Sequence, residues 1–274
     1  MNDPNVSAIL GQYNLATAKS LGQNFLRDGA VLEQIAQAAC PADRILEIGA
    51  GIGSLTGLLC QNAGEVLTVE IDRKLEPLLQ DQVPYENHTF LWQDILKTDL
   101  SAPFEGKSYK IVGNLPYYIT TDILMRLFHA IDHWDQAVLM VQKEVAERLL
   151  AGPGSKEYRA ASVMTQVLCE GELLFEVPPH CFHPAPHVHS AVLRLTPRKE
   201  RPEAKAFMAF AQAAFAARRK KLSSSASLQQ LLSTDKNGLI SLLSQADLPI
   251  DSRAEAFDPE EFRRLYNLAQ KKMG

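Results

Sequence analysis

The chain has 274 residues, of which 46% are hydrophobic, and a formal net charge of −4. That length allows one large or two modest domains with an ample core, and the net charge does not by itself indicate a nucleic-acid-binding protein. No stretch approaches the roughly 18 apolar residues that a membrane helix needs, and the N-terminus predicts no export or anchoring signal.

The first half of the chain shows an alternating pattern. Residues 1–28 are predicted to form an extended arm, followed by a helix at 29–40. Apolar strands and helical stretches then alternate, which is typical of parallel strands joined by crossover helices. The predicted strands are 44–49, 65–71, 89–93, 109–113 and 136–142, and the predicted helices are 54–62, 74–81 and 121–131.

The second half changes character. Two helices and two strands are predicted next, at 143–150, 158–168, 171–177 and 190–196. The last two strands are so close in sequence that they indicate an antiparallel hairpin at the sheet edge. A charged, proline-bounded linker at 197–202 precedes helical stretches over 203–274. We therefore expect a first domain over 1–198 and a small helical domain over 199–274.

Chemistry is concentrated where the predicted strands end, the usual place for ligands in an α/β sheet. The first strand runs into glycines at 49, 51 and 53, which let a ligand lie against the backbone, and Ser54 is placed to cap the following helix. The dinucleotide fingerprint G-x-G-x-x-G would need Gly at position 54. A nicotinamide or flavin oxidoreductase is therefore the weaker alternative.

The next strand ends also carry polar groups. Glu70 can accept hydrogen bonds from both ribose hydroxyls, and Asp94 can accept one from an adenine amino group. The fourth strand ends in an amide acceptor, a stiff turn and a flat ring, which together suit a planar heterocycle with an exocyclic amine: Asn114, Leu115, Pro116 and Tyr117. Taken alone, that turn could equally pack on the core. The ordered series of strand-end groups favours an adenine-containing ligand.

With these motifs the chain resembles the S-adenosylmethionine-dependent rRNA adenine N6-dimethyltransferases. The resemblance covers nearly the whole chain and is strongest to the branch that dimethylates two adjacent adenosines in a hairpin near the 3′ end of small-subunit rRNA. Ala50 stands where the family usually has Pro, and a Ser-rich stretch follows Leu222 where relatives often have Arg, Lys and Asn. Further matching stretches are Leu21–Leu26, Val141–Arg148, Phe182–Ser190, Arg218–Lys220 and Arg253–Glu255.

The resemblance implies an α/β fold with a Rossmann-like class I S-adenosylmethionine methyltransferase sheet, mostly parallel, of seven strands with an antiparallel edge. A small C-terminal helical domain would follow. The residues implied to hold S-adenosylmethionine are Asn24, Leu26, Gly49, Gly51, Glu70, Ile71, Asp94, Ile95 and Asn114. The residues implied to act on the target base are Asn114, Leu115, Pro116, Tyr117 and Phe182.

The chemistry of the reaction indicates roles for the residues that are implied to act on the target base. The N6 lone pair of adenine is delocalised into the ring, so acceptors on the two N6 protons would favour a pyramidal nitrogen that can attack a methyl group. Asn114 Oδ1 and a backbone carbonyl of the Leu115–Pro116 turn are the candidates. Tyr117 is placed to stack on the base and Phe182 to cover its other face. The base must be unpaired or extruded to enter.

The distribution of charge indicates an RNA partner. Residues 190–221 hold nine Lys or Arg against two acids, whereas residues 1–189 hold 13 basic and 23 acidic residues. A basic segment on an acidic body is typical of a polyanion-binding surface, although a solvated linker and helix face would look similar. The predicted RNA-binding residues are Arg218, Arg219, Lys220 and Lys221.

Other readings of the sequence are a large-subunit rRNA dimethyltransferase of the antibiotic-resistance type and a non-catalytic RNA-binding assembly factor on the same fold. His183, His187 and His189 lie near Cys181, but in an extended Pro-rich stretch that favours turn and surface histidines over a metal site. The four cysteines show no C-x-x-C pairing, which predicts reduced thiols and a cytoplasmic protein. We expect a monomer with no metal and no membrane partner.

Overall fold

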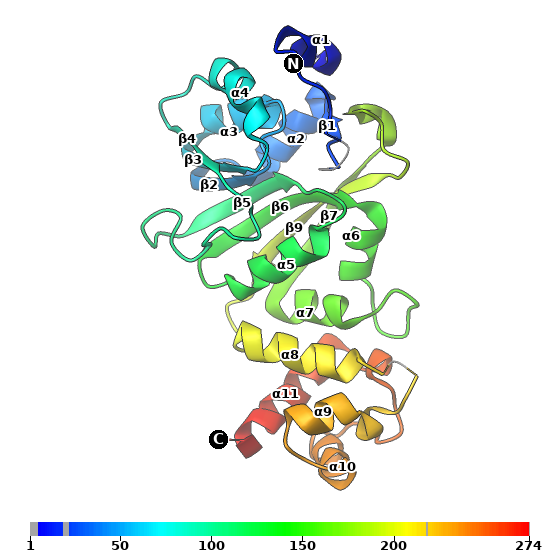
Figure 1. Ribbon diagram of the computed structural model, residues 1–274. Helices are drawn as coiled ribbons and strands as arrows, with labels where there is room; N and C mark the ends of the chain where they lie inside the picture. Colours follow the sequence, from blue (N-terminus) through cyan, green and yellow to red (C-terminus); the bar gives the residue numbers. More distant parts are fainter. Residues whose placement is uncertain (1–4, 19–21, 218, 274) are drawn as a thin grey trace. The chain divides into compact units, whose positions relative to one another are not determined.

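The computed structural model describes residues 5–18, 22–217 and 219–273 (Figure 1). The chain forms two compact units, the first of residues Met1–Ala146 and Glu172–Pro197 and the second of residues Glu147–Gly171 and Arg198–Gly274. Residues 147–171, which the sequence places in the first domain, therefore group with the C-terminal helices. One reason is Tyr158, whose hydroxyl donates to the carbonyl of Phe257 at 2.9 Å.

A seven-stranded sheet forms the centre of the first unit. Its strands follow the order β4-β3-β2-β5-β6-β9-β7. The pairs among β2 to β6 are parallel, and β9 lies antiparallel to β6. The mostly parallel sheet with an antiparallel edge is thus confirmed. The strands are β2 (Ala42–Ile48), β3 (Ala63–Glu70), β4 (His88–Trp92), β5 (Tyr109–Asn114), β6 (Trp134–Gln142), β7 (Cys169–Val177) and β9 (Ser190–Pro197).

Helices cover both faces of this sheet, which explains its apolar central strands. In β2, Ile45, Leu46 and Ile48 are each at most 2% exposed. Helices α2 and α3 pack against each other and against the central strands, and α5 lies across the opposite face (Figure 1). The helices are α1 (Val6–Gln12), α2 (Gly29–Ala39), α3 (Ser54–Asn62), η2 (Arg73–Leu75), α4 (Glu76–Gln82), α5 (Thr120–His129) and η3 (Pro179–Cys181).

The parallel register brings the functional strand ends to one edge of the sheet. Ile48 lies beside Val69 on one side and beside Gly113 on the other. The residues that follow these three positions are Gly49, Glu70 and Asn114, so they emerge at the same level. Side chains far apart in the sequence are therefore gathered into one region by the sheet.

The N-terminal arm is not simply extended. Residues 6–12 form α1, whose first turn is capped by the Asn5 side chain, and Val6 and Leu10 are buried. Further on, β1 (Phe25–Leu26) pairs antiparallel with β8 (Phe182–His183) in a separate two-stranded sheet. The prediction of an extended arm over residues 1–28 is wrong for α1, because its apolar residues at i and i+4 bury one helical face.

The second unit is helical, as the sequence predicts for its C-terminal part. Its core contains two groups of aromatic rings in contact. One group is Tyr158, Phe215, Phe257 and Phe262, and the other is Phe207, Phe210 and Tyr266. Helix α6 spans the boundary between the two units. The helices are α6 (Lys143–Leu149), α7 (Ala160–Leu168), α8 (Ala204–Phe215), η4 (Leu222–Ser224), α9 (Ala226–Leu231), α10 (Lys236–Gln245), η5 (Ala254–Ala256) and α11 (Pro259–Met273).

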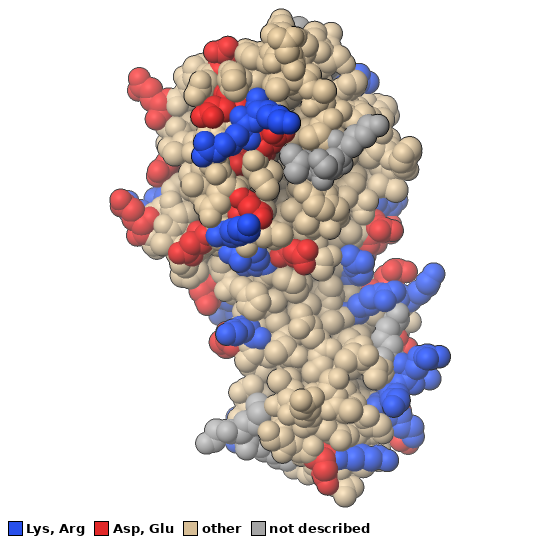
Figure 2. Space-filling model, viewed as in Figure 1, with Lys and Arg blue, Asp and Glu red and all other residues tan. Residues whose placement is uncertain are grey.

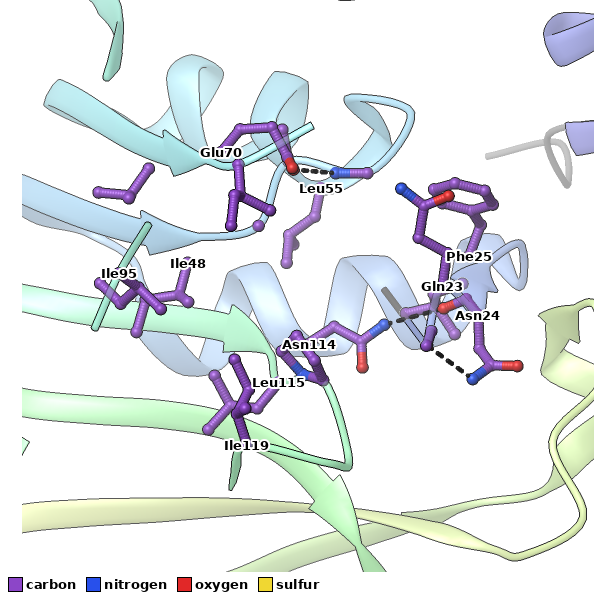
Figure 3. A pocket seen from close by; sticks show the side chains of 18 of the residues that line it. Gln23, Asn24, Phe25, Ile48, Leu55, Glu70, Ile95, Asn114, Leu115 and Ile119 are labelled. Carbon is purple, nitrogen blue, oxygen red and sulfur yellow. Dashed lines mark hydrogen bonds between the residues drawn. The ribbon is translucent and has the colours of Figure 1, made fainter. Parts of the chain in front are cut away.

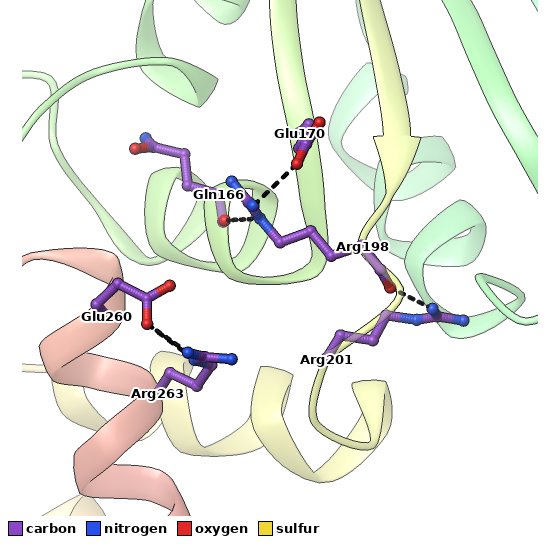
Figure 4. A network of polar contacts seen from close by, with 6 residues as sticks. All are labelled: Gln166, Glu170, Arg198, Arg201, Glu260 and Arg263. Atoms are coloured by element: carbon purple, nitrogen blue, oxygen red, sulfur yellow. Dashed lines mark hydrogen bonds and ion pairs between the residues drawn. The ribbon is translucent and has the colours of Figure 1, made fainter.

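The segment predicted as a linker at 197–202 is held by polar contacts. Arg198 donates through Nε to the carbonyl of Gln166 at 3.0 Å and pairs with Glu170 at 3.2 Å (Figure 4). Arg201 in turn donates to the carbonyl of Arg198 at 2.5 Å. Both basic side chains therefore serve the helical unit itself, which the charge pattern alone did not indicate.

Candidate active site

A cavity of about 300 Å³ opens at the carboxyl ends of the parallel strands. Its walls come from the arm, the glycine turn, the ends of β3 and β4, and the turn before α5 (Figure 3). Every predicted cofactor residue lines it, as do four of the five predicted catalytic residues. These lining residues are Asn24, Leu26, Gly49, Gly51, Glu70, Ile71, Asp94, Ile95, Asn114, Leu115, Pro116 and Tyr117.

The glycine turn forms the floor of the cavity. Gly51 has a φ of +58°, and a Cβ there would lie 3.1 Å from the ring of Phe25 in the arm. Gly53 has a φ of +84° and is the N-cap of α3, so Ser54 is the first helical residue and not the cap that the sequence suggested. A Cβ at Gly53 would approach Val83 to 2.8 Å. Only glycine lets the chain turn this tightly beside a ligand site.

Glu70 is fixed at the end of β3 with its carboxylate directed at the glycine turn. It accepts a hydrogen bond from the backbone N–H of Asp72 at 2.8 Å and another from that of Gly51 at 3.4 Å. Figure 3 shows Glu70 with one dashed hydrogen bond. The side chain is only 6% exposed, and burial raises the pKa of Glu70 above its usual value. A buried acceptor held in this way is suited to a hydroxyl-bearing ligand in the cavity.

The arm is tied to the same strand end. Gln23 donates from Nε2 to Asp72 Oδ2 at 2.9 Å, and the sequence analysis did not single out either residue. Beside Glu70, Ile71 is 51% exposed and offers an apolar surface at the cavity wall. Asp94 accepts from the backbone N–H of Leu96 at 2.9 Å, which orients its carboxylate. The cavity wall thus offers both carboxylate acceptors and apolar surface, which suits a nucleoside.

Asn114 has a defined orientation. Its side-chain Nδ2 donates to the backbone carbonyl of Asn24 at 3.2 Å (Figure 3). Because a carbonyl only accepts, the amide must present its nitrogen there, and no donor among the described residues reaches Oδ1, which can therefore accept from a ligand. The arm therefore decides which way the Asn114 amide points.

The turn after Asn114 contains one further acceptor. The Pro116 carbonyl already accepts from the Ile119 N–H at 3.3 Å and from Thr120 Oγ1 at 2.9 Å. Within the described ranges no hydrogen bond reaches the Leu115 carbonyl. The backbone N–H of Leu115 donates to the carbonyl of Met140 at 3.0 Å. Of the two carbonyls in this turn, that of Leu115 is therefore the better placed to accept a hydrogen bond from a ligand.

The two tyrosines of the turn differ. The Tyr117 hydroxyl lies 2.6 Å from Ser190 Oγ, and burial raises the pKa of this phenol. Tyr118 also lines the cavity but is 57% exposed. The sequence analysis did not assign it a role, although its position directly after the motif could have signalled one.

Phe182 lies outside the described cavity lining. It is 2% exposed and pairs with Leu26 through β8. That Phe182 covers the target base stays a prediction.

The predicted RNA-binding cluster lies in the second unit. Arg218 is outside the described residues, and Arg219, Lys220 and Lys221 are exposed. Figure 2 shows Lys and Arg side chains gathered along one side of this unit. Lys221 pairs with Asp251 at 2.5 Å. The number of basic residues in the sequence segment therefore overstates the positive charge that is available for contacts with RNA.

Glu47 is a buried carboxyl in the Glu47–Gly49 stretch, which matches the family but predicted no role for this residue. It is fully buried in β2, and its Oε2 accepts from Thr56 Oγ1 at 2.7 Å and from Thr68 Oγ1 at 2.8 Å, while Oε1 has no partner within the described part of the chain. Burial raises its pKa to about 7. By joining β2, β3 and α3, Glu47 holds the elements on either side of the glycine turn.

This carboxyl predicts a dependence of stability on pH. Because its folded pKa is raised, its contribution is fully present below the unfolded value of 4.5 and is lost as pH rises through about 7. Between pH 4.5 and 8 the wild type should lose up to about 3 kcal/mol of unfolding free energy relative to Glu47→Gln, which does not titrate. Urea unfolding of both proteins across this range checks the prediction, and parallel profiles would contradict it.

No helix in the described part of the chain is long and apolar enough to cross a membrane. Among the described residues, no group of three or more His, Cys, Asp and Glu side chains is arranged to hold a metal ion.

Comparison with known proteins agrees with this architecture. Residues 14–271 match the family model of the ribosomal RNA adenine dimethylases. The chain is 40% identical to ribosomal RNA small subunit methyltransferase A of Lachnoclostridium phytofermentans, over 97% of this chain and 96% of the relative. It is 42% identical to the protein of the same name from Ligilactobacillus salivarius, over 100% of this chain and 96% of the relative.

Two solved structures share the fold. A dimethyladenosine transferase from Plasmodium falciparum superimposes with a TM-score of 0.80 at 25% identity, covering 91% of this chain and 98% of that one. The 23S rRNA methyltransferase ErmE superimposes with a TM-score of 0.68 at 26% identity, covering 90% of this chain and 100% of that one. The class I methyltransferase fold expected from the sequence is therefore confirmed, and the chain belongs to the ribosomal RNA adenine dimethylase family of enzymes.

Proposed function

We propose that this enzyme transfers methyl groups from S-adenosylmethionine to N6 of two adjacent adenosines near the 3′ end of small-subunit rRNA. It would act in the cytoplasm, as a monomer, on the small ribosomal subunit or its precursor. The curated relatives at about 40% identity carry the name of small-subunit enzymes, which favours this substrate over that of the 23S methyltransferase. Glu70, Asp94 and Asn114 all line one cavity, which favours an active enzyme over a non-catalytic assembly factor.

The observation that carries the proposal is the pair of free acceptors at the Asn114–Leu115 turn. Asn114 Oδ1 is available because its amide nitrogen faces the Asn24 carbonyl, and the Leu115 carbonyl is available because no other group donates to it among the described residues. Two acceptors suit the two protons of an adenine amine. They hold the lone pair out of the ring plane and aim it at the methyl group, while Tyr117 supports the base by stacking.

The remaining lining residues fit the cofactor. When bound, S-adenosylmethionine supplies an activated methyl group on a sulfonium, so the chain needs no nucleophile of its own. Glu70 would accept from the ribose hydroxyls, and Asp94 would accept from the adenine amine. The glycine turn at Gly49 and Gly51 would receive the amino-acid part, with Asn24 and Leu26 of the arm closing over it. Ile71 and Ile95 would contact the adenine ring.

The proposal is tested by supplying methyl-labelled cofactor with undermethylated small subunits or with large subunits lacking their adenine methylation. We expect label only on small subunits, mapped to two neighbouring adenosines with two methyl groups each. Label confined to large subunits would favour the antibiotic-resistance type of enzyme. A correctly folded protein that labels neither would favour the assembly factor.

The exposed cluster of the second unit leads to a prediction about salt. Changing Arg219, Lys220 and Lys221 together to Gln should weaken RNA binding and leave cofactor affinity intact. If all three contact phosphate, the log–log salt slope flattens by about 2, at roughly 0.7 for each single-strand contact. The contact of Lys221 with Asp251 makes us expect a smaller change.

A matched control is available on the same chain. Lys107, Lys236 and Lys271 are also exposed, and changing them to Gln alters the net charge equally. Salt titrations of both triple variants separate a local contact from a general charge effect. Equal slopes in the two variants would make the Arg219–Lys221 cluster an ordinary solvated surface.

A further inference from the structure

Tyr118 is an exposed aromatic residue at the edge of the active-site cavity. It lines the cavity, yet 57% of it is exposed. Only two of the large apolar side chains that are exposed in the described part of the chain line this cavity, the other being Ile71 on the cofactor side. Exposure of a large ring beside a binding site is typical of a contact surface for a ligand.

The ring of Tyr118 is supported from one side by the arm. Gly22 has a φ of +61°, and a Cβ added there would lie 3.2 Å from Cδ1 of the Tyr118 ring. The backbone of the arm therefore passes close to the ring, and a side chain at position 22 would crowd it. This contact restricts the Tyr118 side chain before any ligand binds, which lowers the entropic cost of stacking.

The charge of the cavity limits how RNA can be held there. None of the described lining residues is Lys or Arg, and two of them, Glu70 and Asp94, are acids. The described lining therefore offers no positively charged side chain to a phosphate at the mouth of the site. Stacking on an aromatic ring does not depend on charge, and every base has a face that can stack.

Tyr117, the neighbouring tyrosine, is proposed to have a different role. Tyr117 is anchored through its hydroxyl to Ser190 and is the ring proposed to support the target adenine. For Tyr118, no hydrogen bond of its hydroxyl is found within the described ranges, and its side chain is the more exposed of the pair. A base that remains outside the cavity, one nucleotide from the target, would meet Tyr118.

We propose that Tyr118 is a second stacking residue, which holds the nucleotide adjacent to the target adenosine and thereby favours a purine there. This inference rests on the proposed methylation of RNA and adds a specificity determinant to it. It also gives the arm a role in RNA binding, because Gly22 supports the ring.

The test combines variants of the enzyme with variants of the RNA. Small subunits reconstituted from transcribed rRNA would carry adenosine or uridine on either side of a target adenosine, one side at a time. With adenosine neighbours, Tyr118→Ala should raise KM for the subunit about tenfold, and Tyr118→Phe should stay near wild type. With uridine on the stacked side, the KM of the wild type for the subunit should rise. The further increase in KM caused by Tyr118→Ala should then be smaller than with adenosine. Leu173→Ala, at a residue 45% exposed and outside the cavity lining, is the control and should change nothing.

The outcomes separate this inference from the proposed function. If wild type methylates the small subunit and Tyr118→Ala has the same KM, stacking by Tyr118 is disproved and the function stands. If Tyr118→Ala raises KM by the same factor for adenosine and for uridine on either side of the target, stacking by Tyr118 would also be disproved. Calorimetry that shows weakened S-adenosylmethionine binding in Tyr118→Ala would assign the ring to the cofactor instead. A wild type that methylates no small subunits would overturn the function and this inference together.

Discussion

Asn114→Ala is expected to lower the rate of methylation in a single turnover by roughly 100- to 1,000-fold, the range for losing one preorganised hydrogen-bonding group at a reacting centre. The reason is that Asn114 Oδ1 is held by the contact of its amide nitrogen with the Asn24 carbonyl. Alanine removes both the acceptor and the link to the arm. RNA affinity should fall much less, because phosphate contacts elsewhere supply most of it.

The control for this variant is Asn62→Ala. The Asn62 side chain also donates to a backbone carbonyl, that of Leu58 at 2.8 Å, but it does not line the cavity. Rapid-quench measurements with saturating cofactor and small subunits compare the two variants with wild type. Near-normal methylation by a folded Asn114→Ala protein would exclude Asn114 from the chemical step. If only cofactor affinity fell, its role would be confined to binding.

Glu70→Ala is expected to weaken S-adenosylmethionine binding by roughly 1.5–3 kcal/mol, the usual cost of losing a hydrogen bond to a charged group. Glu70 also accepts from Gly51 and Asp72, so part of the effect would come from the turn itself. Glu70→Gln separates the two contributions, because it retains one oxygen acceptor and a similar volume. By calorimetry, the affinity of Glu70→Gln for S-adenosylmethionine should lie between those of the wild type and Glu70→Ala.

The same carboxyl predicts a pH dependence of binding. Burial raises the pKa of Glu70, so its proton is taken up at a higher pH than for an exposed glutamate. Only the ionised carboxylate accepts from both ribose hydroxyls. Cofactor affinity should therefore fall on acidification, beginning above the usual Glu range, and this fall should be absent in Glu70→Gln. An identical pH profile in the two proteins would show that Glu70 does not contact the cofactor.

Local sequence was sufficient for the strands and for most of the candidate site. The apolar runs before Gly49, Glu70 and Asn114 predicted buried parallel strands, and a parallel sheet necessarily brings their carboxyl ends to one edge. Because of that topological rule, residues tens of positions apart in the sequence could be predicted to line one cavity.

The sequence failed where a residue's role depends on a distant partner. The pairing of β8 with the arm, which joins Phe182 to Leu26, did not follow from either segment alone. The cap at α3 went to Gly53 and not to Ser54, because the turn requires a positive φ that glycine adopts without strain. The basic segment contains Arg194, Arg198 and Lys221, each of which pairs with an acid that the local charge count does not include.

The sequence by itself determined the order of the strand-end groups, because each group lies directly after an apolar run, and this order favoured an adenine-containing ligand. The tertiary structure alone decided which atoms remain free for chemistry. Asn114 presents its oxygen because the arm supplies a carbonyl to its nitrogen. Thr120 donates to the Pro116 carbonyl, whereas no donor in the described part of the chain reaches the carbonyl of Leu115. Hydrogen-bond partners of this kind are set by packing between segments that are remote in the chain, so they follow only from the folded structure.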